Sequence, residues 1–156
     1  LALNEVPHYF KTVYIPDDKF LIVGGIERDN SKTSNRCFMI DDKGKLSTSM
    51  DLHVPRQYFT IATDYTQQLI YVIGGFNNYS GVLDSFETFS IRSRKWVLCE
   101  DTERLNFGRI NAAACKCGEK YVYLFGGLSA DDEFIDGIER FNTQLRIWTV
   151  MDVKLP

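Results

Sequence analysis

Residues 70–75 read IYVIGG and residues 122–127 read VYLFGG, so two apolar runs end in the same pair of glycines. A third run, FLIVGG, occupies residues 20–25. The glycine pairs recur at spacings of 50 and 52 residues. Because apolar residues occupy both alternating faces of each run, we expect strands that are buried on both sides. The sequence therefore predicts three copies of one β-rich unit.

Other residues keep step with the glycines. A glutamate follows the first glycine of the second and third pairs by 13 residues, and a tryptophan follows it by 22. In the first copy the same offsets reach Cys37 and Leu46, so we expect that copy to be divergent. The repeat markers are Gly24, Gly25, Gly74, Gly75, Gly126, Gly127, Glu87, Glu139, Trp96 and Trp148.

A period near 50 residues with these markers resembles the kelch repeat, whose unit is one four-stranded blade of a β-propeller. The resemblance covers nearly the whole chain and implies an all-β fold, with three blades of a partial or open propeller. It places each glycine run on a second strand, residues 85–89 and 137–141 on third strands, and the tryptophans on fourth strands. Residues 1–156 would form one propeller segment. Its blades are expected near residues 7–55, 56–108 and 109–156.

Two arginines also occupy matching positions. By resemblance, Arg56 and Arg109 open the innermost strand of a blade, and they are candidates for contacting an acidic group of a partner. In the alternative, each arginine only ties neighbouring blades together through carbonyls or through Glu87 and Glu139. We expect both glutamates to be structural, because a carboxylate between apolar neighbours needs a hydrogen-bonding partner.

The loops after the glycine pairs, residues 26–35, 76–85 and 128–137, differ most between the copies. Connections of this kind commonly form the protein-binding face of kelch proteins, so the resemblance implies partner recognition there. Aromatic side chains on loops supply large contact area, although they could instead pack under their own loops. The candidate contact residues, besides the two arginines, are Asn77, Asn78, Tyr79, Asp131, Asp132, Glu133 and Phe134.

The sequence offers little for catalysis. A few kelch-like propellers, such as galactose oxidase, are copper enzymes with histidine and tyrosine ligands, but this chain has only His8 and His53. Its four cysteines show no paired spacing typical of a zinc site. We therefore expect no catalytic residue, no cofactor and no metal site, with a copper enzyme as the least favoured alternative.

Composition limits the other classes of function. The chain has 156 residues, of which 44% are hydrophobic, and a net charge of −3 that argues against a phosphate-binding surface. It contains no apolar stretch long enough to span a membrane, and its first residues do not resemble a signal peptide. We expect a cytoplasmic protein that binds neither nucleic acid nor membrane.

Three blades would leave two apolar blade faces in water, because propellers close with more blades than three. The remaining blades of the same longer chain, or a second copy that closes the ring, would cover them. We expect a non-catalytic protein-interaction module with a partner of unknown identity. The resemblance also permits a substrate receptor of a cullin-type ubiquitin ligase, usually beside a BTB domain, or a cytoskeletal scaffold.

Overall fold

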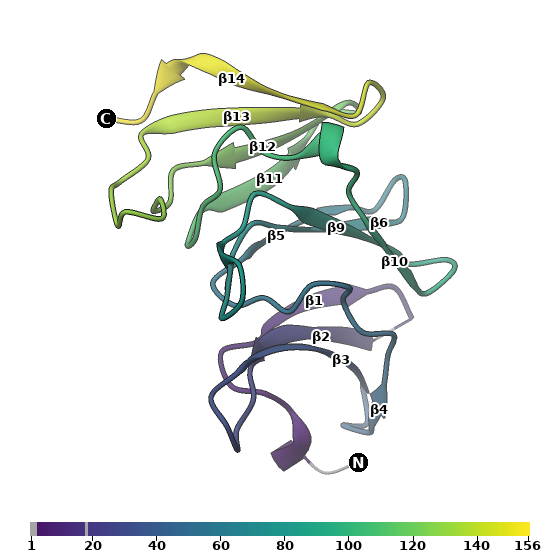
Figure 1. The fold of residues 1–156 in the computed structure, drawn as a ribbon. Helices are drawn as coiled ribbons and strands as arrows, with labels where there is room; N and C mark the ends of the chain where they lie inside the picture. The colour runs from purple at the N-terminus through teal and green to yellow at the C-terminus, as the bar shows by residue number, and fades with distance from the viewer. Residues whose placement is uncertain (1–2, 18) are drawn as a thin grey trace.

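The computed structural model describes residues 3–17 and 19–156 and contains three four-stranded antiparallel sheets. The sheets stack face to face in the order of the sequence, and the chain runs from one end of the stack to the other (Figure 1). The predicted all-β propeller segment is confirmed. Blade 1 comprises β1 (Lys11–Ile15), β2 (Lys19–Ile26), β3 (Thr33–Asp41) and β4 (Leu46–Thr48).

Blades 2 and 3 have the same antiparallel order as blade 1. Blade 2 comprises β5 (Thr60–Asp64), β6 (Leu69–Ile73), β9 (Phe86–Ser90) and β10 (Lys95–Leu98). Blade 3 comprises β11 (Ala113–Cys117), β12 (Tyr121–Phe125), β13 (Gly137–Asn142) and β14 (Ile147–Lys154). A short hairpin of β7 (Phe76–Asn77) and β8 (Gly81–Val82) lies between β6 and β9. Two 3-10 turns, η1 (Leu3–Glu5) and η2 (Asp101–Glu103), complete the elements.

Neither arginine opens an inner strand. The inner strands β5 and β11 begin at Thr60 and Ala113, so Arg56 and Arg109 each lie four residues earlier, in the segment that leads into the blade. Their backbones are occupied by the preceding blade: Arg56 N–H donates to Ser34 O at 3.1 Å, and Arg109 N–H donates to Leu83 O at 3.2 Å. Because the backbone N–H groups of both arginines bond to the preceding blade, the chain must turn away from that blade before it can form the inner strand of the next one.

Of the three hydrophobic clusters among the described residues, two lie between blades, and the third packs Val6 against Ile22, Phe38 and Leu46 of blade 1. One core joins blades 1 and 2 through residues such as Leu21, Val23, Val72 and Trp96. The second core joins blades 2 and 3 and contains residues of both, among them Tyr71, Leu124 and Trp148. A middle strand therefore contributes alternate residues to two different cores, which explains why its sequence is apolar on both faces.

The glycine pairs allow neighbouring blades to approach closely. Gly24 and Gly74 have φ angles of +56° and +64°, and a Cβ on either would lie 2.6 Å from the carbonyl oxygen of Arg56 or Arg109. The next residue of each pair donates to that same oxygen, with distances of 3.0 Å from Gly25 and 2.9 Å from Gly75. Both glycines thus meet the chain that enters the following blade, where no side chain fits.

Blade 1 departs from the other two in its register. Phe38 pairs with Ile22 as Glu87 pairs with Val72, so Phe38, and not Cys37, occupies the glutamate position. The cause is a register shift between Val23 and Gly25, where β2 continues pairing beyond its first glycine.

The arginine position of blade 1 has changed as well. The bridge between His8 and Ile26 corresponds to the bridges Gln57–Phe76 and Ile110–Leu128, so Pro7 stands where the other blades have arginine. Blade 1 therefore lacks both members of the charged pair. Losing both avoids the buried unpaired charge that the loss of one member would leave.

The outer face of blade 3 has no blade packed on it within the described residues. Tyr121, Tyr123 and Phe125 form a row there, with ring centroids 6.2 Å and 6.1 Å apart. Cys117 and Cys115 lie opposite the two tyrosines on β11 and are exposed. The corresponding face of blade 2 is buried against blade 3. The outer face of blade 3 therefore resembles a packing surface between blades that is not covered by another blade.

Candidate interaction face

Arg56 and Glu87 form a buried ion pair, with Nη2 3.2 Å from Oε1 and both side chains fully buried. Nη1 of Arg56 also donates to Gly74 O at 2.9 Å and to Ser85 O at 3.1 Å. Glu87 accepts from the backbone N–H groups of His53 and Val54, at 2.8 Å and 3.0 Å. Burial lowers the pKa of Arg56, whereas the charge and hydrogen bond of Glu87 raise it.

Arg109 repeats this arrangement in blade 3. Its Nη2 pairs with Glu139, and Nη1 donates to Gly126 O at 3.0 Å. Glu139 accepts from the backbone N–H groups of Asn106 and Phe107, at 2.9 Å and 3.2 Å. Burial is the main influence on the pKa of Arg109 and lowers it.

Each arginine thus fastens two blades, because its backbone bonds to the preceding blade and its guanidinium to the following one. The residue exposure of Arg56 is 0% and that of Arg109 is 1%. The structure therefore favours the blade-tying alternative. Contact with a partner would require either arginine to leave its carboxylate and reach the surface.

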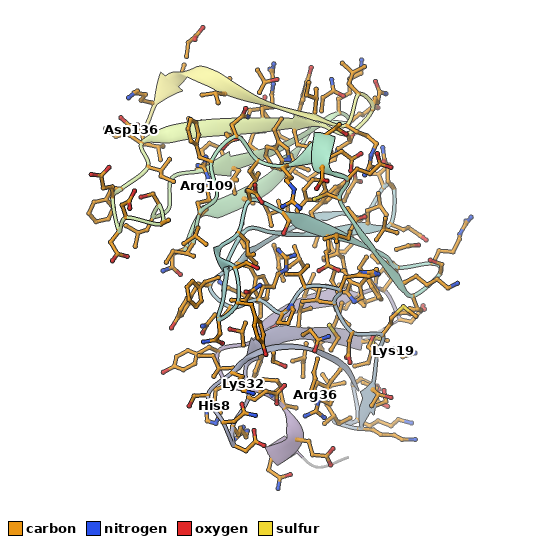
Figure 2. The ribbon with its side chains drawn as sticks, viewed as in Figure 1. His8, Lys19, Lys32, Arg36, Arg109 and Asp136 are labelled. Atoms are coloured by element: carbon orange, nitrogen blue, oxygen red, sulfur yellow. The ribbon has the colours of Figure 1, made fainter. Side chains whose placement is uncertain are left out.

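The predicted contact loops all lie along one side of the stack, on the left in Figure 1. We call this side, where the loops of all three blades project, the loop end. The opposite end carries the tight turns at residues 42–45, 65–68, 91–94, 118–120 and 143–146, and we call it the hairpin end. Figure 2 shows Asp136 at the margin of the loop end, with Arg109 nearer the ribbons and Lys19 at the other end.

The three candidates in the second loop have different roles in the structure. Asn77 is buried, and its Oδ1 accepts from the N–H groups of Tyr79 and Ser80 at 2.9 Å and 2.7 Å, which shapes the turn. Oδ1 of Asn78 accepts from the N–H and the hydroxyl of Thr33, both at 2.7 Å. Tyr79 is 78% exposed. Of these three, Tyr79 has the geometry of a contact residue.

The third loop presents its charged residues to solvent. Asp131, Asp132 and Glu133 are exposed, and none of their carboxylates forms an ion pair with another residue in the described ranges. The hydroxyl of Ser129 accepts from the N–H of Asp131 at 3.2 Å and of Glu133 at 3.3 Å, which shapes the loop. The side chain of Phe134 does not pack under its own loop, since the residue is 91% exposed.

A pocket of about 450 Å³ lies between blades 2 and 3 at the loop end. Its lining has an apolar part, formed by Val54, Val82, Leu83 and Leu98, and a polar part, formed by Ser80, Asp84, Ser85 and Arg104. Ala130 of the third loop, residues 128–137, which we call the acidic loop, also lines it. We call it the interblade pocket. This pocket could not be predicted from the sequence, because its wall combines residues that are far apart in the chain.

An ion pair stands at the edge of the interblade pocket. Arg104 Nη1 lies 2.6 Å from Asp84 Oδ1, and Arg104 Nε lies 3.0 Å from Asp101. These two hydrogen bonds raise the pKa of Arg104. The corresponding pair in blade 3 joins Lys154 to Asp136 at 2.8 Å. Asp84 and Asp136 follow their glycine pairs at the same offset, so the repeat carried a signal for this feature.

A pocket of about 380 Å³ occupies the same position in blade 3, with Phe107, Ile135 and Val150 in place of Val54, Leu83 and Leu98. Asp136 lines it as Asp84 lines the interblade pocket. The motif of one pocket and one acidic rim residue is therefore repeated from blade to blade.

The two histidines lie apart from any ligand cluster. His53 Nδ1 is 2.9 Å from Glu87 Oε2, and His8 is exposed. No group of three or more histidine, cysteine or acidic side chains arranged to hold a metal occurs among the residues that the structure describes. Burial raises the pKa of the Cys37 thiol to about 12, which makes this thiol unreactive at neutral pH. Within the described ranges, no helix has the length and apolar character needed to cross a membrane.

Two comparisons with known proteins bear on this architecture. A family model of the kelch motif matches residues 61–102, which extend from β5 to η2. A curated relative, the RING finger domain and kelch repeat-containing protein of Dictyostelium discoideum, is 29% identical over 133 residues. That match covers 84% of this chain but 13% of the relative, so the chain spans a small part of the relative's length.

Proposed function

Because this chain is a kelch-repeat segment, we propose that it is a non-catalytic protein-interaction module that recognises a protein partner through the loops of its loop end. Kelch repeats generally mediate protein–protein interaction, and domains built from them are typically non-catalytic. The observation that carries the proposal is the contrast between repeated strands and varied loops. The varied loops present two large aromatic side chains, Tyr79 and Phe134, to solvent.

Physical reasons also favour the loops. The strands of blade 2 pack against a neighbouring blade on both faces, so their side chains are not free to recognise a partner. The loops are held rigidly by the blades, which lowers the entropic cost of ordering them on binding. We also propose a cytoplasmic location, and completion of the ring by further blades of a longer chain or by a second copy.

The test selects peptides from a random display library on the intact protein and maps the bound peptide by hydrogen exchange. We expect new protection at residues 26–35, 76–85 or 128–137. Protection confined to the hairpin end, or to the outer face of blade 3, would reject recognition through the loops.

The second candidate is the substrate receptor of a ubiquitin ligase. The observation that favours it is the relative that combines a RING finger domain with kelch repeats. Its test is a ubiquitin-transfer reaction with the intact protein and purified activating and conjugating enzymes. If ubiquitin is transferred to neither the protein nor a bound partner, in the presence or absence of a cullin complex, this candidate fails.

A further inference from the structure

We propose that the interblade pocket binds an apolar side chain of a basic partner segment, whose lysine or arginine residues lie beside Asp131, Asp132 and Glu133. This inference rests on the proposed function and specifies the chemistry of the partner. Among the grooves of the loop end we select this pocket because blades 2 and 3, which enclose it, both belong to the described chain.

An apolar side chain can lie against one part of the pocket wall, whereas Ser80, Asp84, Ser85 and Arg104 make the rest of the wall polar. Val82 and Leu83 come from the loop of blade 2, Leu98 from the end of β10, and Val54 from the segment that leads into blade 2. A volume of about 450 Å³ lies within the range of known ligand sites. Burying a leucine-sized side chain there would stabilise the complex through the hydrophobic effect.

The charge around the pocket decides whether the bound partner segment should be acidic or basic. The Arg104 guanidinium at the pocket is already neutralised by Asp84 and Asp101. The carboxylates of Asp131, Asp132 and Glu133 directly follow Ala130 of the pocket wall, and none of them has an ion-pair partner among the described residues. The uncompensated charge at the rim is therefore negative. Opposite charges across an interface favour association and like charges oppose it, so a basic segment fits and an acidic one does not.

Exposed aromatic side chains supply further contact area. Phe134 lies in the same loop as the three carboxylates, and Phe107, in the segment that leads into blade 3, lines the corresponding pocket of that blade. Both are more than half exposed. Large aromatic side chains are typical of the residues that dominate the energy of protein interfaces.

The experiment repeats the peptide selection on the intact protein and on four variants of it. Ala130→Trp fills the pocket from an exposed position, and Ser93→Trp places the same side chain at the hairpin end as its control. Asp131→Asn, Asp132→Asn and Glu133→Gln together remove the charge of the acidic loop. Asparagine suits residue 132, whose φ is +57°. Asp42→Asn with Glu119→Gln removes exposed charge at the hairpin end.

We expect the selected peptides to carry lysine or arginine beside an apolar residue. A synthetic consensus peptide, titrated by fluorescence anisotropy, should bind on the order of tenfold more weakly to the charge-removed loop variant and to Ala130→Trp, and should lose affinity with added salt. Both control variants should bind it as the native protein does.

Two outcomes overturn the inference and remain distinguishable. If the peptides protect the loop end but are acidic, or bind both loop-end variants unchanged, the assigned chemistry is wrong while the proposed function stands. If they protect the loop end of neither blade, or if no peptide is selected, both proposals fail.

Discussion

At the residue scale, the ion pairs Arg56–Glu87 and Arg109–Glu139 fix the segments that lead into blades 2 and 3. Each glutamate accepts two backbone N–H groups as well as the guanidinium, so its charge is balanced and its oxygens are satisfied. A buried pair of this kind contributes little net stability compared with an apolar replacement, yet removing one member leaves an unpaired charge. Blade 1, with Pro7 and Phe38 at these positions, has no such pair.

The first prediction concerns the two members of the pair in blade 2. Arg56→Met should lower the free energy of unfolding by about 3–5 kcal/mol, because it leaves Glu87 buried without its cation. Combining it with Glu87→Leu should cost less than Arg56→Met alone. Urea unfolding of the intact protein checks both values. A double variant as unstable as the sum of two single variants would contradict this account.

The second prediction compares the two tryptophans. Trp96 Nε1 donates to Met50 O at 2.9 Å, whereas Trp148 Nε1 is buried without a partner among the described residues. Trp96→Phe leaves the Met50 carbonyl without this donor, while Trp148→Phe removes an unsatisfied polar group. Trp96→Phe should therefore be the more destabilising by about 1 kcal/mol, measured by thermal unfolding. Equal losses would show that the indole hydrogen bond contributes nothing.

At the element scale, the blade is the unit that repeats, and the glycine pair sets the distance between blades. Gly74 and Gly81 both have positive φ angles, but a Cβ on Gly74 would meet Arg109 O at 2.6 Å and one on Gly81 would meet nothing within 4 Å. Of these two glycines, only Gly74 is therefore required by the packing of a neighbouring blade. We keep residues 7–55, 56–108 and 109–156 as the proposed blade divisions, which keep each arginine with its own glutamate.

The third prediction follows from that difference. Gly81→Ala should cost about 1–2 kcal/mol for its left-handed backbone alone. Gly74→Ala should cost on the order of 1–3 kcal/mol more, because the backbone of the next blade must move. Chemical denaturation of the two variants checks the order. A Gly74→Ala protein as stable as Gly81→Ala would mean that the blades can separate slightly without loss.

The strands were largely predictable from the sequence, because the apolar runs and the fixed offsets of glutamate and tryptophan reflect packing that repeats. The register of blade 1 was not. A single shift at Val23–Gly25 moves Phe38 into the place assigned to Cys37, and counting residues cannot detect it. The interblade pocket was also missed, because its wall joins Val54 to Ala130 across the fold.

At the scale of the whole molecule, the stack of blades ends at the uncovered outer face of blade 3 among the described residues. The outer face of blade 3 presents its row of aromatic rings and two exposed thiols, and Gly127 N–H lacks the carbonyl acceptor that Gly25 and Gly75 have among the described residues. An incoming lead-in segment would supply that acceptor. Such a segment could come from a further blade of a longer chain or from a second copy, and this completion remains a proposal.

The fourth prediction uses the cysteines as reporters of that face. In a preparation of the 156-residue chain that is monomeric by light scattering, Cys115 and Cys117 should react rapidly with a thiol reagent, and buried Cys37 and Cys99 should react slowly. Where a blade or a second copy covers the face, Cys115 and Cys117 should become slow as well. Mass spectrometry of the labelled peptides gives each rate. Rapid labelling of these two thiols in a stable dimer would exclude a dimer that closes over blade 3.

The position of the fastening arginines has a consequence for the way the chain comes apart. Arg56 follows the last strand of blade 1 in the sequence. Its carbonyl oxygen accepts from Gly25 of blade 1, and its guanidinium pairs with Glu87 of blade 2. Neighbouring blades are thereby coupled as adjacent units in a one-dimensional lattice, where loss of one link exposes the next. A blade transplanted between proteins must therefore carry the lead-in segment that follows it, since a cut at the end of its last strand would leave its glycine pair without an acceptor.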